Sequence, residues 1–340
     1  MLRYTVRRLL QMVVVLVVLS VLLFAWLRSL PGGPVSALLG QRGTAADRVA
    51  LRRQLGLDQP ILVQYLKFLG RASRGDFGVS TGVQQGASAA KVFANRFPAT
   101  IELSVVALLI ALMVGIPLGY FAARRKGTVL DNLSVLSSLI GVAIPVFFLA
   151  FLLKYVFAIQ LGWLPTGGRQ DSIGATQVTG FYVLDGLLTR EWDAAFNALV
   201  HLVLPGIALA TIPFAVIFRI TRAAVLDVLD EDYVRTAEAK GLSTGVIRRR
   251  HVLRNAMLPV VTTVGLQTGA LLAGAVLTEK VFSIPGIGDA LAEGFSKRDY
   301  PVLQVVIMAA AVVYVLINLI VDLSYAVIDP RIRTPRIRMR

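Results

Sequence analysis

The chain has 340 residues, of which 56% are hydrophobic and only 16% are charged. Soluble domains carry about 25% charged residues, so this composition excludes an ordinary soluble protein. The formal net charge of +15 would suit a nucleic-acid partner, but the basic clusters stand beside apolar segments, as they do at the cytoplasmic ends of membrane helices. The chain contains no cysteine, which excludes disulfides and thiolate chemistry. His201 and His251 lie outside any metal-binding pattern, so we expect neither a metal site nor a nucleic-acid partner.

Six apolar stretches are long enough to cross a hydrocarbon core of about 30 Å as helices. They cover residues 9–27, 103–123, 133–158, 198–218, 256–277 and 302–328. The first resembles a signal peptide, but no cleavage site follows it, so we predict that it is retained. Pro205 and Pro213 interrupt the fourth stretch, which a helix tolerates where neighbouring helices or water satisfy the freed carbonyls. We therefore predict an all-α integral membrane protein with about six transmembrane helices.

The charges between the stretches indicate the orientation of the chain. Lys and Arg are concentrated at 124–126, within 219–254 and in the last ten residues, and cytoplasmic segments carry such an excess. We predict that both termini are cytoplasmic. The expected parts are an N-terminal transmembrane helix at 1–30, an extracytoplasmic helical loop at 31–98, a five-helix core at 99–328 with a cytoplasmic loop at 219–255, and a basic cytoplasmic tail at 329–340.

The cytoplasmic loop contains a good candidate for a short surface helix. Residues 233–240 favour a helix, with acidic residues before it and Lys240 at its end, as the helix dipole prefers. Gly241 follows at the position where a glycine with positive φ commonly ends a helix. The sequence thus predicts a capped helix held between two membrane spans.

Motifs for chemistry are missing from the sequence. No G-x-x-x-x-G-K-[ST] phosphate-binding loop and no G-x-S-x-G nucleophile motif occurs. The ionisable residues within the predicted spans, Glu102, Lys154, His201 and Asp322, lie near span edges, where snorkelling or interfacial solvation explains them. A proton-coupled carrier would instead place its acids near the midplane.

Two polar residues lie deeper in the predicted spans. Gln267 belongs to the fifth stretch and Asn318 to the sixth. Such residues can pack helices together as readily as they can line a path, because close helix approach favours small and polar side chains. We interpret Gln267 and Asn318 as candidate residues of a translocation path.

The cytoplasmic loop also resembles a known family motif. Residues 232–242 read D-Y-V-R-T-A-E-A-K-G-L, and Arg254-Asn255 and Pro259 follow. This pattern is similar to the EAA loop of ABC importer permeases, in the form found in the dipeptide, oligopeptide and nickel permease family. Arg235 stands where a glutamate is usual in the general motif, and the spacing from Gly241 to Pro259 is longer; both resemble the peptide subfamily. Further similar motifs occur at 56–60, 75–78, 98–100, 279–282 and 285–288, whereas P-G-G-P at 31–34 replaces an acidic position of relatives.

The resemblance implies a type I ABC importer permease, of the first-subunit kind, that forms half of a path for di- or oligopeptides. It implies coupling to ATPase subunits through a helix that docks into a groove on the ATPase. The corresponding residues here are Tyr233, Arg235, Ala237, Ala239, Gly241 and Leu242. The implied partners are a second homologous permease, two ATPase subunits, an extracytoplasmic substrate-binding protein and membrane lipid. No cofactor is expected in this chain, because ATP and Mg would bind to the ATPases, and the expected location is a bacterial or archaeal plasma membrane.

Other readings remain open from the sequence. The same machine could carry nickel, glutathione or another small solute, because a fold does not determine its cargo. An ion-coupled secondary transporter would need an ion site and often has inverted repeats with matching broken helices, and no such pair is visible. A purely structural membrane protein would leave the surface helix and the long outer loop unexplained.

Overall fold

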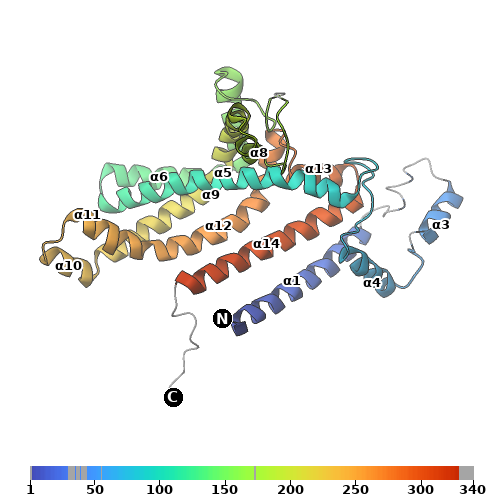
Figure 1. The fold of residues 1–340 in the computed structure, drawn as a ribbon, viewed down its shortest axis with the longest axis horizontal. Coiled ribbons are helices and arrows are strands. Elements are labelled where there is room, and N and C mark those ends of the chain that lie inside the picture. The colour runs from blue at the N-terminus through green and yellow to red at the C-terminus, as the bar shows by residue number, and fades with distance from the viewer. Residues whose placement is uncertain are drawn as a thin grey trace, which may run out of the picture. The chain divides into compact units, whose positions relative to one another are not determined.

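A computed structural model describes residues 2–29, 35, 39, 44–54, 56–171 and 174–328 (Figure 1). Across these residues the regular structure is helical, apart from one isolated bridge between Val79 and Ser88. Two segments, η1 and η2, are π-helical. The elements in chain order are α1 (Leu2–Ser29), α3 (Ala45–Gln54), α4 (Ile61–Ala72), α5 (Ala89–Arg124), α6 (Val129–Ala143), α7 (Val146–Leu153), η1 (Lys154–Gln160), α8 (Tyr182–Leu188), α9 (Trp192–Leu229), α10 (Asp232–Ala239), α11 (Thr244–Val246), η2 (Ile247–Leu253), α12 (Arg254–Val281), α13 (Ile287–Ser296) and α14 (Tyr300–Ile328).

Among the described residues, five helices are long and apolar enough to cross a membrane. They lie at Leu9–Ser29, Ala89–Arg124, Trp192–Leu229, Thr244–Leu272 and Tyr300–Ile320. A sixth span is possible if α6 and the helix that continues from α7 into η1 are counted as one broken crossing. The prediction of an all-α membrane protein with about six spans is confirmed in this form.

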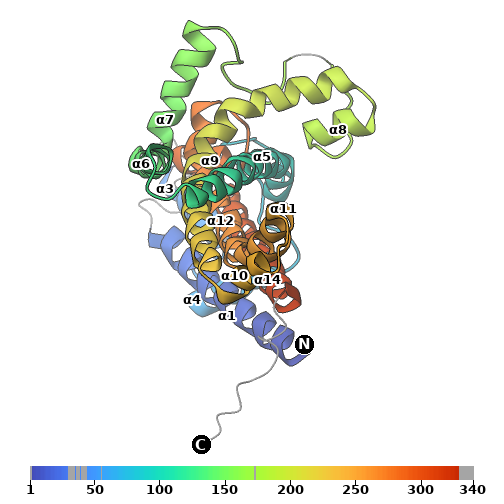
Figure 2. The ribbon, with the colours of Figure 1, turned by 90° about the vertical axis from the view of Figure 1, so that its left-hand side faces the viewer.

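The third predicted span, 133–158, is not one continuous helix. It is divided between Ala143 and Val146, and the axes of its two halves differ by 102° (Figure 2). Pro145 explains the break: it has no backbone N–H to continue the helix, and its ring disfavours helical geometry at the preceding residue. Ile144 accordingly has the extended angles φ −79° and ψ 124°. The expectation of an unbroken span was wrong at this point.

The fourth span behaves in the opposite way. Both Pro205 and Pro213 lie inside α9, which nevertheless continues for 38 residues. In its most apolar window, 61% of the residues are buried, the largest share of any candidate span among the described residues. Packing against α6, α7, α8 and α12 stabilises the helix where two backbone hydrogen bonds are missing.

The contacts divide the chain into two compact units, each considered by itself. The first comprises Met1–Ala99 and Pro285–Leu316. In this unit α1 packs on the start of α14 through Leu23, Leu27, Tyr300 and Leu303, and the two helices lie side by side in Figure 1. A second cluster joins the start of α5 to α13 and α14; it contains Ala89, Val92, Ile287, Ala290, Val302, Val305 and Val306. Helices α3 and α4 belong to the predicted outer loop, whereas the P-G-G-P segment at 31–34 and the tail at 329–340 lie outside the described residues.

A buried carboxylate holds a loop of the first unit in place. Asp299 precedes α14 and is fully buried. It accepts a 2.5 Å hydrogen bond from Ser80 Oγ, and bonds of 2.9–3.1 Å from the backbone N–H groups of the next three residues, Thr81, Gly82 and Val83. Gly82 permits this approach, because a Cβ there would lie 2.7 Å from Lys297 Cβ. The loop that precedes α5 is thereby tied to the turn before α14.

The second unit comprises Thr100–Ile284 and Ile317–Arg340, with α9 packed against α6, α7, α8 and α12. The start of α9 lies beside α8 in Figure 2. On α6, Asp131 binds Arg222 of α9 in a bidentate pair, Nε to Oδ1 at 2.7 Å and Nη2 to Oδ2 at 2.8 Å. Glu279 at the end of α12 is fully buried and accepts a 2.5 Å bond from Thr100 Oγ1. Charged groups thus join distant segments inside an apolar unit.

Two of the ionisable residues assigned to span edges are buried rather than snorkelling. Glu102 is 9% exposed and pairs with the equally buried Arg169 at 2.7 Å, and its second oxygen accepts from the Val183 N–H at 2.8 Å. His201 is 4% exposed, with Nδ1 2.9 Å from the Asn197 carbonyl oxygen. The snorkelling interpretation is wrong for both, because both side chains are buried. Glu102 pairs with Arg169, 67 positions away in a segment that the sequence does not place, whereas His201 bonds within α9.

The other two residues differ from this pair. Lys154 is half-buried and donates from Nζ to the Val281 carbonyl oxygen at 2.8 Å, so it reaches the end of α12. Asp322 lies in α14, and its side chain is outside the described part of the structure.

We predict that Asp299 makes the first unit sensitive to acid. Burial alone would raise the pKa of Asp299, but the bonds from Ser80 and from the backbone N–H groups of Val83, Gly82 and Val302 outweigh it and hold the pKa below its ordinary value. This carboxylate therefore contributes stability that is complete above the ordinary pKa and is lost as the pH falls through the lower, folded pKa. Asp299→Asn should lower the free energy of unfolding at pH 7 by about 2 kcal/mol or more, because an amide is a weaker acceptor than a carboxylate.

Thermal unfolding in detergent between pH 7 and pH 3 would measure this. The Asp299→Asn protein should show less of the acid-induced loss than the unsubstituted chain. Asp58→Asn, at an exposed position of the same unit, is the matched control and should leave both values unchanged. Equal unfolding temperatures for the unsubstituted chain and Asp299→Asn at pH 7 would contradict the prediction.

Candidate functional site

The candidate coupling site is built on α10, which lies between the end of α9 and the segment formed by α11 and η2. Its inner face consists of Val234 and Ala237, which are 1% and 4% exposed. They belong to a cluster with Tyr120 and Ala123 of α5 and Val225 of α9; its other buried members are Ala224, Ile247, Val252 and Ala256. Residues three or four positions apart lie on the same face of a helix, so Val234 and Ala237 together form the buried side of α10. The helix is therefore fixed to several elements of the second unit.

The outer face of α10 carries most of the residues that the motif singled out. Tyr233 is 39% exposed and Leu242, just after the helix, is 40% exposed. The side chain of Arg235 is 68% exposed, with one weak contact of 3.6 Å to Asp232. Ala239 and Gly241 are also exposed. An exposed aromatic at the start of this short helix and an exposed leucine just after its end form a surface suited to contact with another protein.

Ala237 does not belong to this outer face. The family resemblance placed it with Ala239 and Gly241 among the residues that couple to an ATPase. In the structure its methyl group packs against the chain's own helices. Its small size therefore allows α10 to pack closely against the rest of the unit. Ala237 is on the inner face because it lies three residues after the buried Val234.

The end of α10 has the geometry that the sequence predicted. Gly241 has φ +74°. Its N–H donates to the Glu238 carbonyl at 2.9 Å, and the Leu242 N–H donates to the Ala237 carbonyl at 3.3 Å. These two bonds are the Schellman pair, which requires a left-handed residue at the glycine position. The prediction that Gly241 ends the helix is confirmed.

Sequence reasoning missed two residues that position α10. Val234 anchors its buried face, and Asn255 at the start of α12 donates from Nδ2 to Tyr233 Oη at 2.9 Å and to the His251 carbonyl at 2.9 Å. Asn255 stood within the recognised motif without a role. The helical spacing of Val234 and Ala237, three residues apart, was the signal available for the buried face.

The positions of the two candidate path residues do not distinguish path lining from helix packing. Gln267 lies near the middle of α12 and Asn318 in the second half of α14, and both side chains are half-buried. Half-burial suits helix packing and path lining equally. Their assignment to a path stays a prediction.

Comparison with known proteins identifies the family. The family model described as the binding-protein-dependent transport system inner membrane component matches residues 115–334. The N-terminal model of the same membrane components matches residues 1–104. The chain belongs to this family of binding-protein-dependent transport permeases. It is therefore a transport subunit that crosses the inner membrane several times, and the α10 segment lies within the matched region.

Individual relatives match this chain over nearly its whole length. A dipeptide transport system permease of Alkalihalophilus pseudofirmus is 42% identical over 98% of this chain and all of the relative. A di/tripeptide transport system permease of Pseudomonas aeruginosa is 43% identical over 99% of this chain and all of the relative. A glutathione transport system permease of Escherichia coli is 39% identical over 98% of this chain and 99% of the relative. The whole permease, including its outer loop, is shared with these proteins.

We predict that substitutions of Gly241 in this permease distinguish a helix cap from a docking surface. A Cβ at Gly241 would meet no atom within 4 Å, so the cost inside the chain is the left-handed φ, about 1 kcal/mol for alanine. Aspartate tolerates that φ better than alanine does. Gly241→Ala should therefore leave the assembled machine working, whereas Gly241→Asp should reduce ATPase co-purification and transport severalfold, because it adds volume and charge at the contact.

The control is Gly127→Asp. Gly127 also has positive φ, +78°, and open space around a built Cβ, and it lies on the same predicted side of the membrane. Membrane abundance, ATPase co-purification and uptake would be compared for the three variants. Normal abundance, ATPase binding and transport in Gly241→Asp would remove the docking role from this site.

Proposed function

We propose that this permease forms one half of the translocation path of an ATP-driven importer for di- or oligopeptides. The observation that carries the proposal is the match over 98–99% of the chain to permeases named for dipeptide and di/tripeptide transport. A relative named for oligopeptide transport, from Bacillus subtilis, is 37% identical over 97% of this chain. Full-length similarity to several peptide permeases favours a peptide as the cargo.

Glutathione transport is the second candidate function, because the glutathione permease relative is 39% identical over 98% of the chain. Glutathione is itself a small peptide, so the two candidates share a substrate class. A nickel cargo has no comparable support among these relatives. An ion-coupled secondary transporter is disfavoured by membership in a binding-protein-dependent family.

The proposed mechanism assigns the work of ATP hydrolysis to other subunits. This chain has no phosphate-binding loop, so ATP and Mg would be bound by two ATPase subunits. A second homologous permease would complete the path, and an extracytoplasmic protein would deliver the substrate. The role of this chain would be to transmit motion: α10 is rigidly packed on α5, α9 and η2, so displacement of α10 by an ATPase would move those helices as a body.

We predict that uptake of a labelled dipeptide depends on this chain. Cells that lack the chain should take up the peptide only at background level, and complementation should restore uptake. Excess unlabelled glutathione added to the complemented cells separates the two candidates: strong competition would favour glutathione, and weak competition would favour other peptides. Unchanged dipeptide uptake in cells without the chain would contradict the proposed cargo.

We further predict that α10 is cytoplasmic and that the segment before α8 is extracytoplasmic. Because the chain has no cysteine, single cysteines report their own exposure. An impermeant thiol reagent should label Val178→Cys, which is 64% exposed, in vesicles of native orientation. It should label Leu242→Cys, 40% exposed, only after the membrane is permeabilised. Labelling of Leu242→Cys in sealed vesicles would reverse the topology.

A further inference from the structure

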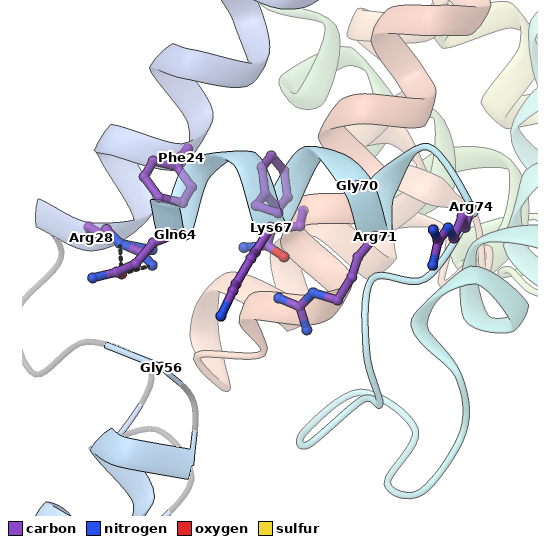
Figure 3. A pocket seen from close by; sticks show the side chains of 10 residues that line it. Phe24, Arg28, Gly56, Gln64, Lys67, Gly70, Arg71 and Arg74 are labelled. Carbon is purple, nitrogen blue, oxygen red and sulfur yellow. Dashed lines mark hydrogen bonds between the residues drawn. The ribbon is translucent and has the colours of Figure 1, made fainter. Parts of the chain in front are cut away.

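A basic pocket of about 480 Å³ lies in the first unit, between α1, α4 and α14 (Figure 3). Four cationic side chains line it: Arg28 from the end of α1, Lys67 and Arg71 from α4, and Arg74 from the turn that follows α4. No Asp or Glu is among the lining residues. In Figure 3, Lys67 and Arg71 point to the same side of α4. The pocket therefore concentrates positive charge on one side of a short helix.

Within the described part of the chain, no ion pair joins Arg28, Lys67, Arg71 or Arg74 to a carboxylate. Like charges repel one another when they share a small volume, and the repulsion is greater where protein and membrane exclude water. An anion bound among them would relieve it.

Arg28 is held ready for such a ligand. Its Nε and Nη2 both donate to Gln64 Oε1, the Nε bond being 3.1 Å long. The guanidinium lies over the Phe24 ring, 4.0 Å from its centroid. Gln64 is fixed in turn, since its Nε2 donates to the Leu57 and Gln59 carbonyls. A guanidinium restrained in this way keeps its remaining N–H donors in one orientation, which favours a phosphate or carboxylate ligand.

An apolar groove of about 540 Å³ lies further along the same helices. On α1 it begins at Ser20, one turn or about 5.4 Å from Phe24 of the basic pocket, and continues to Val13. On α14 it extends from Met308 to Val313, one turn beyond Gln304 of the basic pocket. Its lining is almost entirely apolar. A ligand that used both sites would have a negatively charged head and a long apolar chain.

We propose that the basic pocket binds the phosphate of an anionic phospholipid, and that an acyl chain of this lipid enters the apolar groove. Trp26, two positions before Arg28, is 40% exposed, and tryptophans are enriched at membrane interfaces. A soluble anion would leave the groove unused, and an acidic protein surface would not reach along α1 into the membrane. The proposal rests on the permease spanning the membrane and is independent of its cargo. If the chain crossed the membrane in the opposite orientation, the lipid would bind in the other leaflet.

The test uses the full-length permease in its purified assembly. The assembly is exchanged into phosphatidylglycerol or phosphatidylcholine, and native mass spectrometry then measures how much lipid it retains. These lipids share acyl chains and a phosphate and differ in net charge. The protein should retain phosphatidylglycerol about tenfold better than phosphatidylcholine, and Lys67→Gln/Arg71→Gln should abolish this preference, because two of the four cations are lost. The matched control, Arg48→Gln/Arg52→Gln, removes two exposed cations of α3 outside the pocket and should keep the preference.

Three results would overturn the proposal. One is an equal preference for phosphatidylglycerol in the Lys67→Gln/Arg71→Gln protein and in the unsubstituted protein. Another is displacement of the bound lipid by millimolar glycerol phosphate, which would make the pocket a site for soluble anions. The third is unchanged lipid retention together with loss of the substrate-binding protein in the Lys67→Gln/Arg71→Gln assembly, which would make it a protein contact. An absence of dipeptide uptake by the unsubstituted permease would contradict the proposed cargo and would leave the lipid proposal unaffected.

Discussion

The pairing of buried carboxylates is the constraint on which much of this permease depends. A carboxylate removed from water is costly unless charged or N–H donors surround it. Here Asp299 is surrounded by Ser80 and three successive N–H groups, and Glu102 by Arg169 and a backbone N–H. Asp131 meets Arg222. In each case the two partners lie between 67 and 219 positions apart, so satisfying one acid determines where a distant loop or helix must lie.

Buried backbone groups likewise need neighbours that satisfy or cover them. This requirement explains why proline has different effects in two of the spans. Pro205 and Pro213 remove hydrogen bonds from α9, yet close packing keeps this helix continuous, as at Gly206, where a Cβ would lie 3.0 Å from Val106 Cγ1. Pro145 lies between two shorter, largely exposed helices, and there the chain turns by 102°. Proline therefore breaks the span that is largely exposed and is tolerated in the span that is mostly buried. This difference shapes the second unit.

Helix α10 and the basic pocket present their surfaces in different ways. Helix α10 buries Val234 and Ala237 in the unit, while Tyr233 and the following Leu242 are exposed, so the surface proposed for docking is carried on a packed helix. In the basic pocket, Arg28 is restrained by Gln64 and Phe24, while Lys67 and Arg71 of α4 remain exposed. One surface offers apolar contact in a fixed place. The other offers charge beside an apolar groove, which is the pattern of an amphiphilic ligand.

The sequence by itself determined the membrane class, the approximate positions of the spans, the capped helix ending at Gly241 and the family motif, because these depend on local composition and on residues close together in the chain. It did not determine that the span containing Pro145 breaks, that Ala237 faces inward, or that Glu102 and His201 are buried. Each of these depends on which distant segment packs against the residue. A proline breaks or is tolerated, and an acid is solvated or paired, according to neighbours supplied only by the tertiary structure.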